Sequence, residues 1–418
     1  MKILVVTQYF WPENFRINDL AHGLKDKGHE ITVLTGIPNY PSGRFFTGYG
    51  YFSKRTEHCD GIRVIRMPLI PRGKGNWLGL SLNFLSFALS ASILAPFYCQ
   101  DDYDIIFVYE PSPITVGLPA IILKKFKTVP LMFWMQDLWP ESLSATGAIT
   151  SNRILKIVEF IVRLIYRKSD KILIQSRAFK NSIVKQGGDQ KRILYYPNSA
   201  EELYKPVELG ADATERADMP DGFCVTFAGN IGAAQSFATI IDAAALLRNQ
   251  KNVHWVVIGD GRMYPWVVDQ VKQRNLNRTV HLLGRHPTEM MPRYFALSDV
   301  LLVTLKKEPI FALTIPSKVQ SYLACAKPIV AAMDGEGAKV IEEAGAGMAC
   351  PAENPKALAE TVLKFYNMSE ADQKEMGNKG REYFEKHFER EMLFDRLEGW
   401  MKELVTQRHK GTKKEVKE

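Results

Sequence analysis

The feature that most constrains this chain is a regular alternation of short apolar runs with longer segments of helical character. An apolar run at 2–7 is followed by an amphipathic stretch, 17–27, that ends at Gly28, and then by a second apolar run at 30–34. A strand, a helix and a strand in this order predict a βαβ unit and therefore a parallel sheet. An irregular loop rich in glycine, proline and aromatic residues is expected at 36–61. Further strands are expected at about 62–67, 104–109, 130–134, 171–175 and 192–196, with helices at about 78–98, 114–126, 151–168 and 177–186.

The alternation stops at 199–222, an acidic stretch without periodicity, and then starts again at 223. Strands are expected in this second half at 223–228, 253–258, 279–282, 299–304 and 328–332. We therefore predict an α/β protein with two doubly wound, Rossmann-like domains, at 1–200 and 223–378, joined by a linker at 201–222. A long helical stretch at 379–408 is predicted to cross back and pack on the first domain. The last residues, 409–418, are polar and charged, and we expect a disordered tail.

Cysteine content and charge narrow the class of protein. The five cysteines are odd in number, widely spaced and without any CxxC, which argues against a disulfide framework or a zinc site and fits a reducing cytoplasm. Residues 1–200 contain 25 Lys and Arg against 15 Asp and Glu, a net charge of +10, although the whole chain carries only +8. The basic residues are not interleaved with aromatics as in a single-strand binding platform, so we do not expect a nucleic-acid partner.

The basic half also contains the most apolar segment, 75–100, which has no charged residue. Four basic residues lie just before it, at Arg63, Arg66, Arg72 and Lys74. The segment is long enough to span a membrane, but serines, Asn83 and Pro96 dilute it. A buried helix, a helix resting in the membrane interface and a true span all remain open, and the basic residues suit an anionic lipid surface under the second interpretation.

Residues 308–328 form a loop and a short helix between two predicted buried strands. Pro316 suits the first turn of a helix, where Ser317 and Lys318 meet free backbone N–H groups. A helix start that carries a lysine attracts anions, and phosphate above all. The alternative is that Lys318 is an exposed lysine on an ordinary helix.

Other loops at predicted strand ends have ligand-binding character. The turn Gly229–Gln235 has two glycines that allow close approach to a diphosphate, and the turn at 258–262 also follows a strand. Arg285 lies in the loop 284–287, which offers backbone groups to a nucleobase. In the first half, the loop 135–141 brings carboxylates and tryptophan together, a combination that suits sugar binding. Each loop is also compatible with an ordinary turn, and Trp139 with a core position.

Taken together, these motifs resemble those of a known family. The patterns QDLWPES, FAGNIGxAQ, IGDG, PSKVQSYLA and KPI appear at 136–142, 227–235, 258–261, 316–324 and 327–329, with a Pro-Glu-Asn loop at 12–14. The chain thus resembles the retaining, GT-B-fold glycosyltransferases of family four, in their bacterial O-antigen and capsule branch. Its nearest likeness is to N-acetyl-fucosamine transferases. The resemblance covers nearly the whole chain.

The resemblance implies two facing domains around a cleft and transfer of a hexosamine-type sugar from a UDP-sugar to a lipid-diphosphate-linked saccharide, with retention. No cofactor or metal is implied, and the enzyme would act in the cytoplasm, peripherally on the inner face of the membrane. Residues implied to bind the donor are Gly229, Asn230, Gly232, Gln235, Gly261, Arg285, Thr314, Ile315, Pro316, Ser317, Lys318 and Ser321. Asp137, Lys318 and Glu13 are implied to be catalytic, and Arg16, Trp139 and Glu141 to lie on the acceptor side.

Several family positions differ here. The Arg and Lys that hold the donor diphosphate in the wider family are replaced by Asn230 and Gln235, and the two glutamates of the Ex7E motif by Leu313 and Ser321. A first-domain histidine is replaced by Asp137. Lys318, its helix start and Arg285 are left as the positive groups near a diphosphate, and Ser321 or Gln320 as ribose contacts.

Two other enzyme classes compete with this interpretation. A DxD pattern at 102–104 suggests a metal-dependent transferase, although it lies before a predicted strand, at the end away from a ligand. A UDP-sugar 2-epimerase on the same fold is the alternative function, but such an enzyme does not need the apolar segment with its basic flank.

Overall fold

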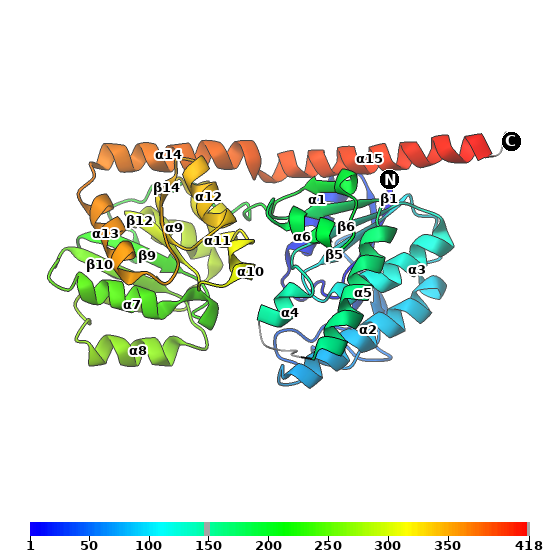
Figure 1. The fold of residues 1–418 in the computed structure, drawn as a ribbon, viewed down its shortest axis with the longest axis horizontal. Helices are drawn as coiled ribbons and strands as arrows, with labels where there is room; N and C mark the ends of the chain where they lie inside the picture. Colours follow the sequence, from blue (N-terminus) through cyan, green and yellow to red (C-terminus); the bar gives the residue numbers. More distant parts are fainter. Residues whose placement is uncertain (146–150, 416–418) are drawn as a thin grey trace. The chain divides into compact units, whose positions relative to one another are not determined.

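The computed structural model describes residues 1–145 and 151–415, and its chain divides into two compact units. Unit 1 comprises Met1–Tyr196 together with Leu393–Glu418, and unit 2 comprises Pro197–Met392. Both are built on parallel sheets flanked by helices (Figure 1). The predicted α/β class with two Rossmann-like domains is therefore confirmed.

Within the described residues, unit 1 has an eight-stranded sheet in the order β3-β4-β2-β1-β5-β6-β7-β8. Its strands are β1 (Lys2–Val6), β2 (Glu30–Gly36), β3 (Thr56–Cys59), β4 (Ile62–Met67), β5 (Ile105–Glu110), β6 (Leu131–Met135), β7 (Lys171–Ile174) and β8 (Ile193–Tyr195). β1 lies between β2 and β5, with Ile3 opposite both Ile31 and Ile105. Because the chain runs outward from β1 in both directions, the carboxyl ends of β1 and β5 form the switch point where ligands bind in such sheets.

The helices of unit 1 are α1 (Arg16–Asp26), α2 (Trp77–Tyr98), α3 (Gly117–Lys127), α4 (Glu141–Ala145), α5 (Asn152–Lys168), α6 (Phe179–Lys185) and the C-terminal α15 (Arg390–Glu415). α15 runs beside α1 (Figure 1). Phe394 packs against Gly23, where a Cβ atom would lie only 1.9 Å from the ring, and Lys27 pairs with Asp395 at 2.6 Å. The last helix therefore completes the first unit, as predicted for the fold.

Unit 2 contains a six-stranded parallel sheet in the order β11-β10-β9-β12-β13-β14, counted over the part of the chain that the structure describes. The strands are β9 (Phe223–Ala228), β10 (Val253–Ile258), β11 (Val280–Gly284), β12 (Val300–Thr304), β13 (Ile329–Ala332) and β14 (Gly347–Cys350). Alternate residues of β10 enter two different cores, with Val256 on one face and Val257 on the other. The switch point of this sheet lies between β9 and β12.

The helices of unit 2 are α7 (Phe237–Leu246), α8 (Tyr264–Gln273), α9 (Met291–Ala296), α10 (Pro309–Ala312), α11 (Ser317–Ala324), α12 (Glu336–Glu343), α13 (Pro355–Tyr366) and α14 (Glu370–His387). α11 packs in the core that includes Val256, and α7 in the core that includes Val257. Pro316 is the residue before α11 rather than part of its first turn.

Several predicted segments differ from the structure. The expected loop at 36–61 contains β3, an antiparallel edge strand, and β14 was not predicted. The single helix predicted at 379–408 is two helices, because α14 ends at His387 and α15 begins at Arg390. The predicted linker belongs to unit 2, where Glu215, which is 3% exposed, pairs with Arg293.

The predicted disordered tail at 409–418 was wrong for residues 409–415, which continue α15. Lysine and glutamate are good helix formers, so the segment extends an existing helix without needing a new nucleus. Residues 416–418 lie outside the described part of the chain.

Candidate functional site

The turn after β9 and the start of α11 meet at the switch point of unit 2. Gly229 has φ +130°, a conformation that favours glycine, and a Cβ atom there would lie 2.8 Å from Lys318 Cε and 3.1 Å from Lys318 Nζ. The predicted partnership of the glycine turn with Lys318 is thus present in the geometry.

The Lys318 ammonium group is buried and has no hydrogen-bond partner among the residues that the structure describes. It lies 3.4 Å from the centroid of the Phe227 ring, which provides its nearest favourable contact. Burial lowers the pKa of Lys318 to about 7. A buried cation without an acceptor is costly, and an anion placed beside it would remove that cost.

The same turn brings four more predicted residues together. Gln235 Oε1 accepts a hydrogen bond from the backbone N–H of Gly232 at 3.1 Å. A Cβ atom on Gly261 would lie 2.7 Å from Asn230 Oδ1 and 2.5 Å from the carbonyl oxygen of Ile231. Gly259, with φ +141°, touches the carbonyl of Gly229 in the same way. The loops after β9 and β10 are therefore packed backbone to backbone, as a phosphate-binding turn requires.

The donor-binding residues predicted in and around α11 differ in their exposure and hydrogen bonds. Ser317 is exposed at the first position of the helix, whereas Ile315 is buried and Thr314 donates to the carbonyl of Phe311 at 3.0 Å. Ser321 is 7% exposed and donates to the carbonyl of Ser317 at 3.3 Å. Ser321 is thus turned toward its own helix. Arg285 is exposed in the loop after β11.

Gln320 and Lys327 also have structural partners. The buried amide of Gln320, oriented with its nitrogen toward the helix, donates to the carbonyl of Pro316 at 3.0 Å. Lys327 donates to the carbonyls of Ala296 and Ser298 at 2.9 and 2.7 Å. In this structure, therefore, the lysine of the KPI motif holds the end of α9.

In unit 1, Glu13 lies in the loop after β1 and is 2% exposed. Its Oε1 accepts the backbone N–H groups of Asn39 and Tyr40, each at 2.7 Å, and burial raises its pKa to about 7. Glu13 therefore fixes the loop after β2 to the loop after β1.

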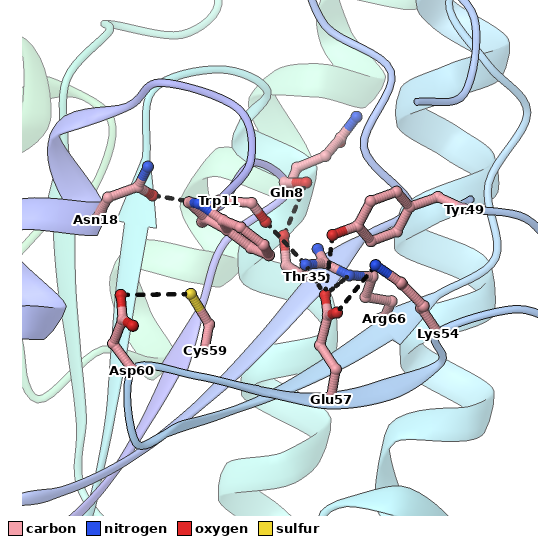
Figure 2. Close-up of polar contacts among 10 residues, drawn as sticks. All are labelled: Gln8, Trp11, Asn18, Thr35, Tyr49, Lys54, Glu57, Cys59, Asp60 and Arg66. Atoms are coloured by element: carbon pink, nitrogen blue, oxygen red, sulfur yellow. Dashed lines mark hydrogen bonds and ion pairs between the residues drawn. The ribbon is translucent and has the colours of Figure 1, made fainter. Parts of the chain in front are cut away.

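A second set of contacts, centred on Arg66 and Glu57, also holds the loop after β1 (Figure 2). Arg66 on β4 is 1% exposed, pairs with Glu57 on β3, and donates to the carbonyl of Trp11 at 2.8 Å. Tyr49 donates to the same Glu57 at 3.3 Å, and its ring lies 4.9 Å from the Arg66 guanidinium. Asn18 accepts from the N–H of Trp11 at 3.1 Å. These contacts give the unpredicted strand β3 a role in positioning the loop.

The predicted acceptor residues gather near the carboxyl ends of β5 and β6. Asp137 follows β6 and is half-buried, and burial raises its pKa to about 6. The pKa of the buried Tyr109 is raised by burial, lowered by the charge of Arg16, and raised by the charges of Glu110 and Asp137. Arg16 and Asp137 are therefore near the same tyrosine.

Glu110, the last residue of β5, was not predicted as a site residue. It is completely buried, and the backbone N–H groups of Gln136 and Asp137 lie close to its carboxylate. Neither carboxylate oxygen meets strict hydrogen-bond geometry with any residue that the structure describes. Burial raises its pKa well above the usual value, and the charge of Asp137 raises it further. The nearby indole N–H of Trp139 also lacks a partner within hydrogen-bond geometry. An acidic residue directly at the end of an apolar strand was the sequence signal.

Trp139 and Glu141 differ in exposure. Trp139 is 7% exposed, so its ring packs in the interior rather than offering a free face to a sugar. Glu141 is half-buried at the start of α4, and its Oε2 is buried without a partner. The DxD aspartate Asp104 accepts from the backbone N–H of Lys2 at 2.7 Å, at the amino end of the sheet.

Both units match models of known protein families. A model for a glycosyl transferase 4-like domain matches residues 14–199, and a model for glycosyl transferases group 1 matches residues 216–383. A protein of Pseudomonas aeruginosa named as a probable glycosyltransferase, WbjE, is 25% identical over 69% of this chain and 74% of its own length. WcaI of Escherichia coli K12, named as a colanic acid biosynthesis glycosyl transferase, is 24% identical over 78% of this chain and 81% of its own.

Among solved structures, Anabaena HepE in complex with UDP superposes with a TM-score of 0.69. It shares 16% identity over 96% of this chain and 100% of its own, a likeness that concerns the fold. The two family models together match both domains, and the fold agrees with them. The chain therefore joins a glycosyl transferase 4-like first domain to a second domain of the group 1 glycosyl transferases, and it has the GT-B fold.

Proposed function

We propose that this glycosyltransferase moves a hexosamine-type sugar, such as N-acetyl-fucosamine, from a UDP-sugar to a lipid-diphosphate-linked saccharide during assembly of a bacterial surface polysaccharide. The observation that carries the donor assignment is the unpartnered ammonium group of Lys318 against the Gly229 turn. The names of WcaI and of the UDP complex of HepE support the polysaccharide and the nucleotide.

In the proposed reaction the diphosphate occupies the space beside Lys318, the Gly229–Gly232 turn and the start of α11. The bond between the anomeric carbon and the diphosphate oxygen breaks while a bond forms to the acceptor hydroxyl oxygen on the same face. Because the new bond forms on the face that the diphosphate leaves, the configuration is retained. The departing phosphate oxygen takes the hydroxyl proton, so protons and charges balance. Fixed positive groups stabilise the leaving diphosphate, where negative charge develops.

On the acceptor side we propose that Asp137 orients a sugar hydroxyl. Its half-buried position beside Arg16 and Tyr109 supports this role, and its raised pKa leaves it ionised above about pH 6. Glu13 acts by holding the loops after β1 and β2 in place.

The test is a screen of UDP-sugars against a short lipid-diphosphate-linked N-acetylglucosamine, with the product mass and anomeric configuration as readouts. We expect one UDP-hexosamine to add a single sugar in the retained configuration, and the rate to be unchanged in excess chelator. Formation of an epimerised UDP-sugar without any acceptor would instead identify an epimerase, and loss of transfer with chelator would show a metal requirement.

A further inference from the structure

The longest apolar helix of unit 1, α2, has an unusual distribution of side chains. Each of its exposed positions is a large hydrophobic residue: Trp77, Leu78, Leu82, Leu85, Leu89, Ile93 and Phe97. These side chains are between 42% and 69% exposed. They follow a helical spacing of three or four residues over most of the helix and therefore form one continuous apolar stripe.

Three polar residues of α2, Asn83, Ser86 and Ser90, form hydrogen bonds into unit 1 rather than facing water. Asn83 is completely buried, accepts from Gln8 at 2.7 Å and donates to the carbonyl of Ile70 at 2.7 Å. Ser86 accepts from the N–H of Ile70 at 2.8 Å, and Ser90 donates to the carbonyl of Pro68. A helix on a water-exposed surface places its polar side chains outward. α2 shows the reverse arrangement.

These inward hydrogen bonds also decide between lying on a membrane and crossing one. Of the helices that the structure describes, α2 alone is long and apolar enough to cross a membrane. However, Asn83, Ser86 and Ser90 join the middle of the helix to the 68–70 segment and to Gln8 in the loop after β1. A helix held in this way lies along the surface of unit 1, with only its outer face free.

α5 supplies charge on the same layer of helices. The helices α2, α3 and α5 precede or follow β5 and β6, and right-handed crossovers place all three on one face of the sheet. α3 packs against α2 and against α5 (Figure 1). Between α3 and α5, Gly117 lies against the side chain of Ile165. The outer side of α5 alternates basic and apolar residues: Arg153, Ile154, Lys156, Ile157, Phe160, Arg163 and Arg167 are all exposed.

We propose that the outer faces of α2 and α5, here called the α2–α5 face, rest on the surface of a membrane rich in anionic lipid. Apolar side chains of α2 would enter the interface, and the basic residues of α5 would meet lipid phosphates. A second copy of the chain is a poorer occupant, because α2 carries no acidic residue, so a two-fold contact would place the basic residues of α5 against apolar or other basic side chains. The inference rests on the proposed function in that a lipid-linked acceptor requires an enzyme at the membrane.

The test uses the full chain and sedimentation with vesicles of phosphatidylcholine, either alone or with about a third phosphatidylglycerol. We expect binding to the anionic vesicles and much weaker binding to neutral ones. The triple variant Leu85→Ser, Leu89→Ser, Ile93→Ser should bind at least about tenfold more weakly, since it removes three apolar contacts. Arg153→Glu with Lys156→Glu should remove most of the preference for anionic vesicles, at about fivefold per residue.

The matched control is Leu246→Ser, which changes a leucine of similar exposure, 58%, on α7 of unit 2 and should bind like the unaltered protein. Leu89→Ser alone guards against misfolding in the triple variant, and its melting curve should match that of the control. The proposal is overturned if the unaltered chain binds neither vesicle, or binds both equally well. It is also overturned if the protein is a dimer in solution that Leu89→Ser dissociates.

Failure of this inference and failure of the proposed function give different results. If the α2–α5 face binds the membrane, the triple variant keeps its transfer rate to a water-soluble acceptor analogue and loses transfer to an acceptor embedded in vesicles. If the protein binds vesicles but glycosylates no acceptor, the proposed function is wrong and membrane binding by the α2–α5 face is still supported. If the triple variant transfers equally well to both acceptors, membrane binding by the α2–α5 face is wrong and the proposed function is still supported.

Discussion

The ammonium group of Lys318 lies 3.4 Å from the centroid of the Phe227 ring and makes no hydrogen bond. The ring offers the cation partial compensation for its loss of water, but only an anion offers full compensation. Phe227 is the penultimate residue of β9, and its position over the lysine keeps the side chain close to the Gly229 turn. An anion bound beside this turn would therefore stabilise the charged form of Lys318 more than the ring does.

Replacement of Lys318 tests this arrangement directly. We expect Lys318→Ala to lower kcat by about 100- to 1,000-fold, the usual cost of losing one fixed donor at a developing negative charge. Lys306→Ala, an exposed lysine in the loop after β12, is the matched control and should change kcat little. Full activity of Lys318→Ala, with normal binding of the UDP-sugar, would show that the diphosphate lies elsewhere.

The pH dependence of UDP binding should report the same lysine. In the free protein burial lowers the pKa of Lys318 to about 7, and a bound diphosphate should raise it. Above pH 7 the free amine is largely neutral, so binding must take up a proton, and affinity should fall as pH rises. Calorimetry at pH 8 in buffers of different ionisation enthalpy should detect this uptake, and Lys318→Ala should lack it. Equal heats in all buffers for the unaltered protein would contradict the prediction.

Glu110 should make the stability of unit 1 depend on pH. Its pKa is raised in the folded state, so between the unfolded and folded pKa values the folded protein holds a proton that the unfolded chain releases. Stability due to this group is thus complete at low pH and declines as pH rises above about 4.5. Glu110→Gln should be more stable than the unaltered protein at pH 8, by about 1.4 kcal/mol for each unit of pKa elevation, and similar at pH 4.

Urea unfolding followed by tryptophan fluorescence suits this measurement, because five of the seven tryptophans lie in unit 1. Asp102→Asn, which changes an exposed carboxylate near the start of the same strand, should show no such difference. An equal effect of Glu110→Gln at both pH values would mean that the side chain acts through packing alone.

The contact between Gly23 and Phe394 predicts the effect of two opposite glycine substitutions. A methyl group on Gly23 would overlap the Phe394 ring, so Gly23→Ala should destabilise unit 1 by about 1–3 kcal/mol. Gly399 is exposed in α15 with no atom within 4 Å of its Cβ direction, so Gly399→Ala should stabilise the helix by about 0.5–1 kcal/mol. Calorimetric unfolding checks both signs, and a stabilising Gly23→Ala would show that α15 does not pack there in solution.

Much of the fold could be predicted because buried parallel strands leave a clear signal. β9 and β10 were predicted at their observed bounds, since each is a run of apolar residues bounded by polar ones. β3 was missed because its TEHC sequence is polar and it pairs only at the edge of the sheet. β14 was missed because glycine and alanine do not distinguish a strand from a loop.

The candidate site was predictable only to the level of loops. Topology places the ends of parallel strands at one edge, so Gly229 and Lys318 were expected near each other. The sequence does not reveal which face of β9 packs against α11, a helix much later in the chain. The contact of Phe227 with Lys318 was therefore missed. The burial of Trp139 and of Ser321 likewise depends on tertiary packing, and only the structure provides it.

The membership of α15 in unit 1 has a consequence for synthesis of the protein. Residues 197–392 leave the ribosome before the last helix does, so unit 2 has all of its sequence available for folding first. Unit 1, although translated first, exposes the surface around Gly23 until Phe394 emerges. A nascent chain in which the last helix has not yet emerged would thus carry a finished second domain and an unfinished first one. The two domains would complete their folding in the reverse of the order in which they are translated.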